Sequence, residues 1–310
     1  MSENDTSHSP QPSDAVDVEV RPGLREDLMA LTKFRLSILV VITAVVGYLA
    51  GVRGEVEGWM VFHLVIGVGC AAFGSAIFNQ LMEIEHDKRM LRTRGRPLPA
   101  QRMEPAVAMA LGLLVSAFGL VHLARKVMPD NPQPAYLTAL TLTLYVFVYT
   151  PMKRGSSANT LVGAVVGGIP PMIGWMAAGN GYDLGAWFWF GVLFFWQLPH
   201  FIAINWMYRD EYRNAGFLMW SNNDDTGKFS ASLATGFSFI LAAWMIIPGP
   251  SGLAAWWSVA VAILLSLWLV ILSAAFLKSP SREAARKLFF ATLIYLPIVL
   301  AALVMGWYKV

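Results

Sequence analysis

Residues Trp59–Pro97 read WMVFHLVIGVGCAAFGSAIFNQLMEIEHDKRMLRTRGRP, an apolar run that ends in a dense group of charged side chains. The first part of the run, Trp59–Leu81, contains no Asp, Glu, Lys or Arg. A helix of about 20 apolar residues crosses the ~30 Å hydrocarbon core of a bilayer. The stretch therefore predicts a membrane-spanning helix whose end carries both acids and bases at the membrane surface.

The composition of the whole chain agrees with a location in the membrane. Of its 310 residues, 56% are hydrophobic and 14% are charged, whereas an ordinary soluble domain has about 25% charged residues. A soluble fold cannot cover its surface with so few charges, so that class is excluded. The single cysteine, Cys70, excludes an internal disulfide and a cysteine zinc site. We expect the lipid bilayer, and no nucleic acid, as a partner.

About nine stretches are long and apolar enough to cross a membrane. Because only helices and closed barrels satisfy their backbone hydrogen bonds in lipid, these stretches predict an all-α integral membrane protein. We expect a single membrane domain over residues 24–310, preceded by a disordered cytoplasmic tail over residues 1–23. The predicted spans are approximately Leu36–Val52, Trp59–Leu81, Pro105–Ala124, Ala135–Thr150, Thr160–Ala178, Ala186–Met207, Phe229–Pro248, Leu253–Leu277 and Leu288–Tyr308.

Lys and Arg residues fall almost entirely on one side of the predicted membrane. The segments before the first span and after the second, fourth, sixth and eighth spans hold 19 of the 23 Lys and Arg residues, and the other segments hold 4. Positive residues mark the cytoplasmic side. We therefore expect a cytoplasmic N-terminus and a periplasmic C-terminus. The acidic tail is neither a secretory signal nor a transit peptide, which indicates a bacterial inner membrane.

The first polar island runs from Asn79 to Pro99. Asn79, Glu83 and Asp87 are spaced by four residues, which places them on one face of a helix. Two carboxylates and an amide are oxygen donors that suit a Mg²⁺ ion shared with a phosphate group. Basic residues follow that could hold such an anion, namely Lys88, Arg89, Arg92, Arg94 and Arg96. The alternative is an amphipathic helix whose charges face solvent or anionic lipid headgroups.

Two further polar islands follow later spans on the same predicted side. His200 lies in the sixth span or near its cytoplasmic end, and an imidazole close to lipid is a functional candidate. The alternative is a histidine bonded to a neighbouring backbone carbonyl. Asp210 and Glu211 follow it as a second acidic pair. Lys153 and Arg154 follow the fourth span, where they either bind an anion or serve only as topology anchors.

Taken together, these motifs resemble the UbiA superfamily of intramembrane aromatic prenyltransferases. The likeness rests on the N-x-x-x-E-x-x-x-D pattern of Asn79–Asp87 and on a second acidic motif after the sixth of nine helices. Within the superfamily the chain looks like the branch that farnesylates heme. That closer likeness covers roughly residues 33–310 and rests on RTRGRPLP (Arg92–Pro99), YTPMKR (Tyr149–Arg154) with Asn159, WQLPHF (Trp196–Phe201), RDEY (Arg209–Tyr212) and AGF (Ala215–Phe217).

The resemblance implies a helical bundle around a central cavity that opens at the cytoplasmic rim. It also implies that a farnesyl group moves from farnesyl diphosphate to a vinyl group of heme b, with addition of water and with Mg²⁺ as cofactor. The residues that it implies as catalytic metal ligands are Asn79, Glu83, Asp87, Asp210 and Glu211. The residues that it implies as diphosphate-binding are Arg92, Arg94, Arg96, Lys153 and Arg154.

The resemblance also implies a catalytic, heme-side role for His200. The residue is expected to ligate the iron, to support the porphyrin or to take a proton during the addition of water. Aromatic rings could stabilise the allylic cation that the departing diphosphate leaves, and the candidates are Tyr149, Trp196, Phe201 and Trp206. A downstream heme A synthase or an oxidase assembly factor is an expected partner.

Three other readings of the sequence stay open. A transporter would place ionisable groups near the middle of the membrane, whereas these spans carry almost none and the acids lie at one rim. A prenyltransferase that acts on a quinone-type aromatic acceptor would share the diphosphate chemistry, and His200 with the RTRGRPL run argues against it. A purely structural membrane subunit leaves the acidic and basic islands without a purpose.

Overall fold

A computed structural model describes residues 22–127 and 130–308 of the chain. The predicted disordered tail, residues 1–23, lies outside these residues except for Pro22 and Gly23. The described residues form helices and no strand beyond one isolated bridge. The helices are α1 (Leu24–Leu31), α2 (Phe34–Gly51), α3 (Gly58–Asp87), α4 (Pro105–Lys126), α5 (Gln133–Thr143), η1 (Leu144–Tyr149), α6 (Thr150–Gly155), α7 (Asn159–Ala177), α8 (Leu184–Met207), α9 (Arg209–Asn214), α10 (Lys228–Trp244), α11 (Trp256–Lys278) and α12 (Arg282–Gly306).

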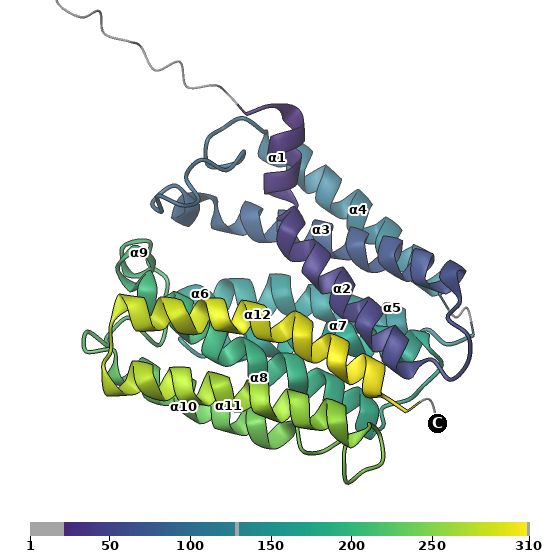
Figure 1. Ribbon diagram of the computed structural model, residues 1–310. Helices are drawn as coiled ribbons and strands as arrows, with labels where there is room; N and C mark the ends of the chain where they lie inside the picture. The colour runs from purple at the N-terminus through teal and green to yellow at the C-terminus, as the bar shows by residue number, and fades with distance from the viewer. Residues whose placement is uncertain (1–21, 128–129, 309–310) are drawn as a thin grey trace, which may run out of the picture.

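The protein is a multi-span membrane protein. Within the described residues, eight segments are at least 18 residues long and apolar enough to cross a bilayer. The one predicted span outside these eight is the seventh, Phe229–Pro248, which corresponds to α10; this helix has 17 residues and is ~26 Å long at 1.5 Å per residue. Helix α10 packs between α8 and α11 in the same bundle, as Figure 1 shows. The all-α membrane bundle is therefore confirmed, with eight candidate spans in the described residues where about nine were expected, and α10 is too short to count as a further one.

Two helix boundaries differ from the predicted spans because polar residues continue the helices beyond the apolar runs. Helix α3 continues from the predicted end at Leu81 to Asp87, so that the first acidic island is helical. Helix α12 begins at Arg282, where Ser281 caps the N-terminus by accepting a hydrogen bond from the Ala284 N–H. Both extensions carry charged side chains to the end of the bundle.

The helices form two groups that are joined by a middle layer. Helices α3 and α4 pack together on one side, and α8, α10, α11 and α12 form the other side. Helices α2, α5 and α7 lie between the two groups (Figure 1). The contact between α2 and α7 is close because a Cβ atom on Gly47 would meet the backbone of Pro171, and one on Gly174 would meet the backbone of Ala44. Small residues of this kind let membrane helices approach each other.

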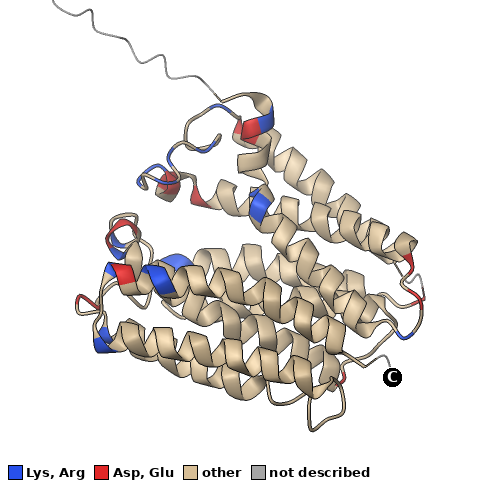
Figure 2. Cartoon of the chain, in the orientation of Figure 1, with Lys and Arg blue, Asp and Glu red and all other residues tan. Residues whose placement is uncertain are grey.

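Charged residues gather at one end of the bundle. Figure 2 shows most Lys, Arg, Asp and Glu residues near α9, the end of α3 and the start of α2, and few along the helices. The short helix α1 is fixed at this end by Asp27, whose carboxylate accepts hydrogen bonds from Nε and Nη2 of Arg102 at 3.1 and 2.7 Å. This end is therefore where polar chemistry is concentrated.

Candidate active site

The three oxygen donors predicted on α3 lie on one face of the helix and are all buried. Asn79 is fully inaccessible, and Glu83 and Asp87 are 3% and 2% exposed. The four-residue spacing therefore produced the expected polar face. Because unpaired carboxylates cannot stay charged in such surroundings, each of these groups needs a polar or charged partner.

Each donor on α3 has a cationic partner from a different segment of the chain. Lys33 donates to Oδ1 of Asn79. Lys153 Nζ lies 2.8 Å from Glu83 Oε1, and Arg96 Nη1 lies 2.7 Å from Asp87 Oδ2. We call these six residues the ion-pair cluster.

Local structure explains how these cations reach α3. Lys33 lies between α1 and α2 with a left-handed backbone (φ 46°), which turns the chain into α2. Lys153 lies on α6, whose first residue Thr150 accepts a hydrogen bond of 3.0 Å from Asn79 Nδ2. Arg96 lies in the loop after α3, and that loop is tied back by a 3.0 Å hydrogen bond from the Thr93 hydroxyl to the Asp87 carbonyl.

The second acidic pair lies apart from the first. Asp210 is the second residue of α9 and has an exposed side chain, and its carboxylate is 3.8 Å from Nε of Arg209. No group of three or more His, Cys, Asp or Glu side chains in the described parts of the chain is placed to hold a metal ion. The five predicted ligands therefore do not form one such group: Asn79, Glu83 and Asp87 lie on α3, and Asp210 and Glu211 lie on α9. Metal binding by Asp210 and Glu211 stays a prediction.

The predicted diphosphate-binding residues also divide into two sets. Arg96 and Lys153 belong to the ion-pair cluster, whereas Arg94 is exposed at the surface. Arg92 donates to the Tyr212 hydroxyl at 3.1 Å and lies over the ring of Tyr208. Arg154 donates to the carbonyl of Met82. Arg92 and Arg154 therefore bind protein groups here, and only Arg96 and Lys153 face the α3 carboxylates.

The three polar islands meet at the charged end. Phe217, from the segment after α9, contacts the His86 ring at a centroid distance of 5.2 Å and lies 5.8 Å from the Lys153 ammonium. Met90 is buried with Phe217 in one apolar cluster. The backbone N–H of Leu218 donates to the Lys153 carbonyl at 2.6 Å. The segment after α9 thus packs against both the end of α3 and α6.

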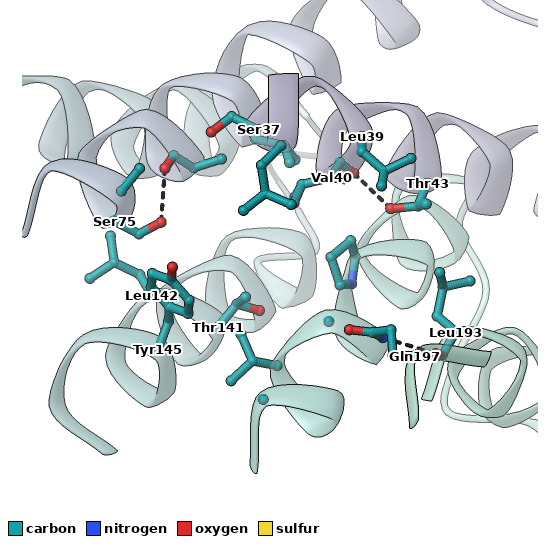
Figure 3. A pocket seen from close by; sticks show the side chains of 18 of the residues that line it. Ser37, Leu39, Val40, Thr43, Ser75, Thr141, Leu142, Tyr145, Leu193 and Gln197 are labelled. Carbon is teal, nitrogen blue, oxygen red and sulfur yellow. Dashed lines mark hydrogen bonds between the residues drawn. The ribbon is translucent and has the colours of Figure 1, made fainter. Parts of the chain in front are cut away.

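A largely apolar cavity extends inward from Lys33 between α2, α3, α5, η1, α7 and α8. The volume of this cavity is about 260 Å³. Figure 3 shows side chains from three sides of it, including Val40 of α2, Tyr145 of η1 and Gln197 of α8. Gly167 faces Gln197 so closely that a Cβ atom would collide with its amide. Glycine at this position therefore leaves room for the Gln197 side chain at the cavity wall.

The π-helical turn η1 places two tyrosines on the cavity wall. Tyr145 and Tyr149 both line the cavity, and their rings stack with centroids 5.3 Å apart. The Tyr145 hydroxyl is 3.4 Å from Lys33 Nζ. Single π-helical turns are rare in proteins, and those that occur are often found at functional sites. This turn brings aromatic faces next to the ion-pair cluster.

Helix α8 supplies the wall that carries His200. The imidazole lines the cavity and lies between two rings, with the Trp196 centroid at 5.3 Å and the Phe289 centroid at 4.8 Å. Its Nδ1 atom is 2.8 Å from Oγ1 of Thr292 on α12. The alternative expectation, a histidine bonded to a backbone carbonyl, is wrong for Nδ1, because its partner is a side-chain hydroxyl.

The aromatic candidates have different positions. Tyr149, Trp196 and Phe201 line the cavity. Trp206 does not, because its indole N–H donates to the Asp224 carbonyl at 3.1 Å and its ring packs on Phe276. Sequence analysis missed Lys33, Tyr145 and Gln197 as cavity residues. Lys33 had a signal, since it is a lone lysine directly before the first span.

Comparison with known proteins finds a family model, a curated relative and two solved structures that this chain resembles. Residues 40–296 match the model of the UbiA prenyltransferase family. The chain is 40% identical over 279 residues to the protoheme IX farnesyltransferase of Opitutus terrae, covering 90% of this chain and 93% of that protein. It is similar in fold to a solved digeranylgeranylglyceryl phosphate synthase (TM-score 0.75, 17% identity, 91% and 98% of the two chains). It also resembles a UbiA homolog from Archaeoglobus fulgidus solved with GPP and Mg²⁺ (TM-score 0.64, 11% identity, 89% and 99%).

Proposed function

Because the chain belongs to the UbiA prenyltransferase family, we propose that it transfers a farnesyl group from farnesyl diphosphate to a vinyl group of heme b and produces heme O. The allylic C–O bond of farnesyl diphosphate breaks, and a C–C bond forms between the farnesyl C1 atom and the vinyl group. Water then adds to the vinyl-derived cation and loses a proton. Diphosphate is the leaving group.

One observation carries the proposal: a single apolar cavity is lined both by Lys33 of the ion-pair cluster and by His200 in its aromatic surroundings. A farnesyl diphosphate has an anionic head and an apolar tail, and heme has an apolar ring with an iron that accepts imidazole. The relative from Opitutus terrae carries the name protoheme IX farnesyltransferase, which supports this choice of acceptor.

The donor set on α3 fits a Mg²⁺ ion. Asn79, Glu83 and Asp87 offer oxygen atoms on one helix face, and hard oxygen ligands are what this ion binds. The UbiA homolog from Archaeoglobus fulgidus was solved with GPP and Mg²⁺. Bound at these three residues, the ion supplies Lewis-acid stabilisation of the diphosphate oxygens. Asp210 and Glu211 are proposed as further ligands toward the same headgroup.

Lys33, Lys153 and Arg96 are the cations that bind the diphosphate. They already point at the α3 donors, so a diphosphate held there through Mg²⁺ would receive positive charge on several sides. Arg92, Arg94 and Arg154 add positive potential at the same end of the bundle. Prearranged donors of this kind stabilise the charge that builds on a leaving group, commonly by several kcal/mol.

The cavity walls protect the allylic cation until it meets the vinyl group. The lining is mostly aliphatic and aromatic, which excludes bulk water from the reacting carbon. The stacked rings of Tyr145 and Tyr149 lie next to the cations that hold the headgroup. Aromatic faces stabilise a nearby cation by about 0.5–2 kcal/mol.

His200 holds the acceptor. Its ring lines the cavity between Trp196 and Phe289, where planar aromatic neighbours also suit a porphyrin. We assign it as the residue that contacts heme, with its imidazole as a ligand to iron. We also propose that the charged end faces the cytoplasm of a bacterial inner membrane, with the C-terminus in the periplasm. A heme A synthase or an oxidase assembly factor then receives the product.

The decisive experiment incubates the purified protein in detergent with heme b, farnesyl diphosphate and Mg²⁺, followed by mass spectrometry of the porphyrin. The expected product is heavier than heme b by one farnesyl group and one hydroxyl group. Parallel reactions offer a quinone-type aromatic acceptor in place of heme. Prenylation of that acceptor, together with unmodified heme, would assign the chain to the other branch of the family.

A further inference from the structure

Thr292 of α12 connects three groups around His200. The residue is fully buried, and its Oγ1 atom is 2.6 Å from the carbonyl oxygen of Phe289. The same Oγ1 is 2.8 Å from Nδ1 of His200. The Thr292 carbonyl accepts a hydrogen bond of 2.8 Å from the indole N–H of Trp196. Thr292 does not line the cavity, so it acts from behind the cavity wall.

The number of protons in this group fixes the tautomer of His200. Two oxygen atoms 2.6 Å apart need a proton between them, and the Phe289 carbonyl has none. The single hydroxyl proton of Thr292 therefore goes to that carbonyl. The contact between Thr292 Oγ1 and His200 Nδ1 also needs a proton, which only the imidazole can then supply. His200 consequently carries its proton on Nδ1, and Nε2 keeps a lone pair.

The neighbouring rings fix the plane of the imidazole. Trp196 and Phe289 lie at interplanar angles of 23° and 29° to His200. The indole of Trp196 is linked to Thr292 directly, since its N–H donates to the Thr292 carbonyl, whereas Phe289 accepts from the Thr292 hydroxyl through its backbone carbonyl. One buried residue thus sets the tautomer of the imidazole and holds the Trp196 ring beside it.

We propose that Thr292 is a positioning residue that keeps the Nε2 lone pair of His200 available to the iron of heme. The inference rests on the proposed function, in which His200 contacts heme. Metal-bound histidines generally donate their second ring N–H to an oxygen acceptor, which fixes the ring and makes the ligand more basic. Here the acceptor is the Thr292 hydroxyl, and loss of such a partner commonly weakens metal binding about 10- to 100-fold.

The test titrates ferric heme b into the full chain in detergent and follows the Soret band and the electron paramagnetic resonance signal. Thr292→Val keeps the shape of the side chain and removes the hydroxyl, so it is expected to weaken heme binding about tenfold and to shift both spectra. Thr292→Ser keeps the hydroxyl and is expected to restore the wild-type spectra. Farnesyl diphosphate affinity is expected to stay unchanged in both variants.

Thr235→Val is the matched control. Thr235 on α10 also donates its hydroxyl proton to a carbonyl of its own helix, that of Ala231 at 2.8 Å, and it does not line the cavity. This variant is expected to show wild-type heme spectra. Thr292→Ala provides a second variant without the hydroxyl and is measured in the same way, which covers the case in which valine lowers the yield of folded protein.

The outcomes distinguish the positioning role of Thr292 from the proposed reaction on heme. Wild-type spectra in both Thr292→Val and Thr292→Ala, or equal losses in Thr292→Val and Thr292→Ser, would overturn the positioning role. A His200→Ala variant with the wild-type heme spectrum would instead remove His200 from the acceptor site. A wild-type chain that binds heme through His200 and forms no farnesylated product would overturn the proposed reaction and leave the role of Thr292 standing.

Discussion

The ion-pair cluster, through Lys33, and the His200 wall border one cavity, yet their polar groups are satisfied in opposite ways. In the cluster, the carboxylates of Glu83 and Asp87 are held by cations from other segments of the chain. At the wall, His200 is held by one neutral hydroxyl and two aromatic rings. Charge-assisted contacts can be exchanged when another anion arrives, whereas a neutral bond to a fixed hydroxyl selects one tautomer.

The comparison indicates that the ion-pair cluster and the His200 wall serve different substrates. The cluster is built from the start of α2, α3, α6 and the loop after α3, so several segments respond together when its charge balance changes. The wall is built from α8 and α12, which pack against each other along the bundle. We therefore expect substitutions in the cluster to affect the diphosphate and the chemical step, and substitutions at the wall to affect the acceptor.

The largest effect is expected from the carboxylates of the cluster. Glu83→Gln or Asp87→Asn removes a proposed metal ligand and leaves Lys153 or Arg96 without its partner, so turnover should fall at least about 10²–10³-fold. Mass spectrometry of the product against time measures the rate. Glu85→Gln is the control, because its exposed carboxylate pairs only with exposed Lys88. Substantial Mg²⁺-dependent activity in both cluster variants would contradict the assignment.

Lys153 and Arg154 give the next test, since they are neighbours with different surroundings. Lys153 is half-buried and pairs with buried Glu83, whereas Arg154 is exposed and binds the Met82 carbonyl. Lys153→Met should lower kcat about 10²-fold, because it removes a proposed donor to the leaving group. Arg154→Gln should lower it by less than about fivefold, as expected for a screened surface charge. Equal losses of kcat in the two variants would show that pairing with Glu83 does not make Lys153 more important for turnover than Arg154.

His200→Ala should separate the two regions directly. Without the imidazole, the dissociation constant for heme b should rise about 10- to 100-fold, while that for farnesyl diphosphate should change little. Spectral titration gives the first constant, and competition with a labelled diphosphate gives the second. A variant that loses diphosphate binding and retains heme binding would reverse the proposed arrangement.

The smallest effect is expected at Asp224, a carboxylate at the charged end of the bundle that stabilises the local structure. Burial alone would raise the pKa of Asp224, but the Ser230 N–H at 2.7 Å and the Thr226 hydroxyl at 3.2 Å outweigh it and lower the pKa. Its stabilising contribution is therefore present at neutral pH and is lost as pH falls through the lowered folded-state pKa.

Asp224→Asn should consequently lower Tm modestly at pH 7 and leave the product rate at moderate temperature close to that of the wild type. The Tm difference between the two proteins should narrow as the pH falls below about 4. Thermal unfolding in detergent across this pH range measures it. A difference in Tm that does not depend on pH would mean that the Asp224 charge contributes nothing to stability.

Much of the fold and part of the site were predictable from the sequence. Apolar runs of sufficient length set the spans, and four-residue spacing set the face of α3, because both depend on the geometry of a single helix. The clustering of charges at one end also followed from the positions of Lys and Arg along the chain. The His200 candidate arose in the same way, from a polar residue near the end of an apolar run.

Pairing between segments was not predictable. Lys33, Lys153 and Arg96 are far apart in the chain or lie in loops, and only helix packing decides that they reach the α3 donors while Arg92 turns to Tyr208 and Tyr212. Nothing local marked Thr292 as the partner of His200, since the two residues are 92 positions apart. The sequence by itself determined the membrane helices and the chemistry each carries, and the tertiary structure decided the partners, because a contact between helices depends on their packing and not on the spacing within either one.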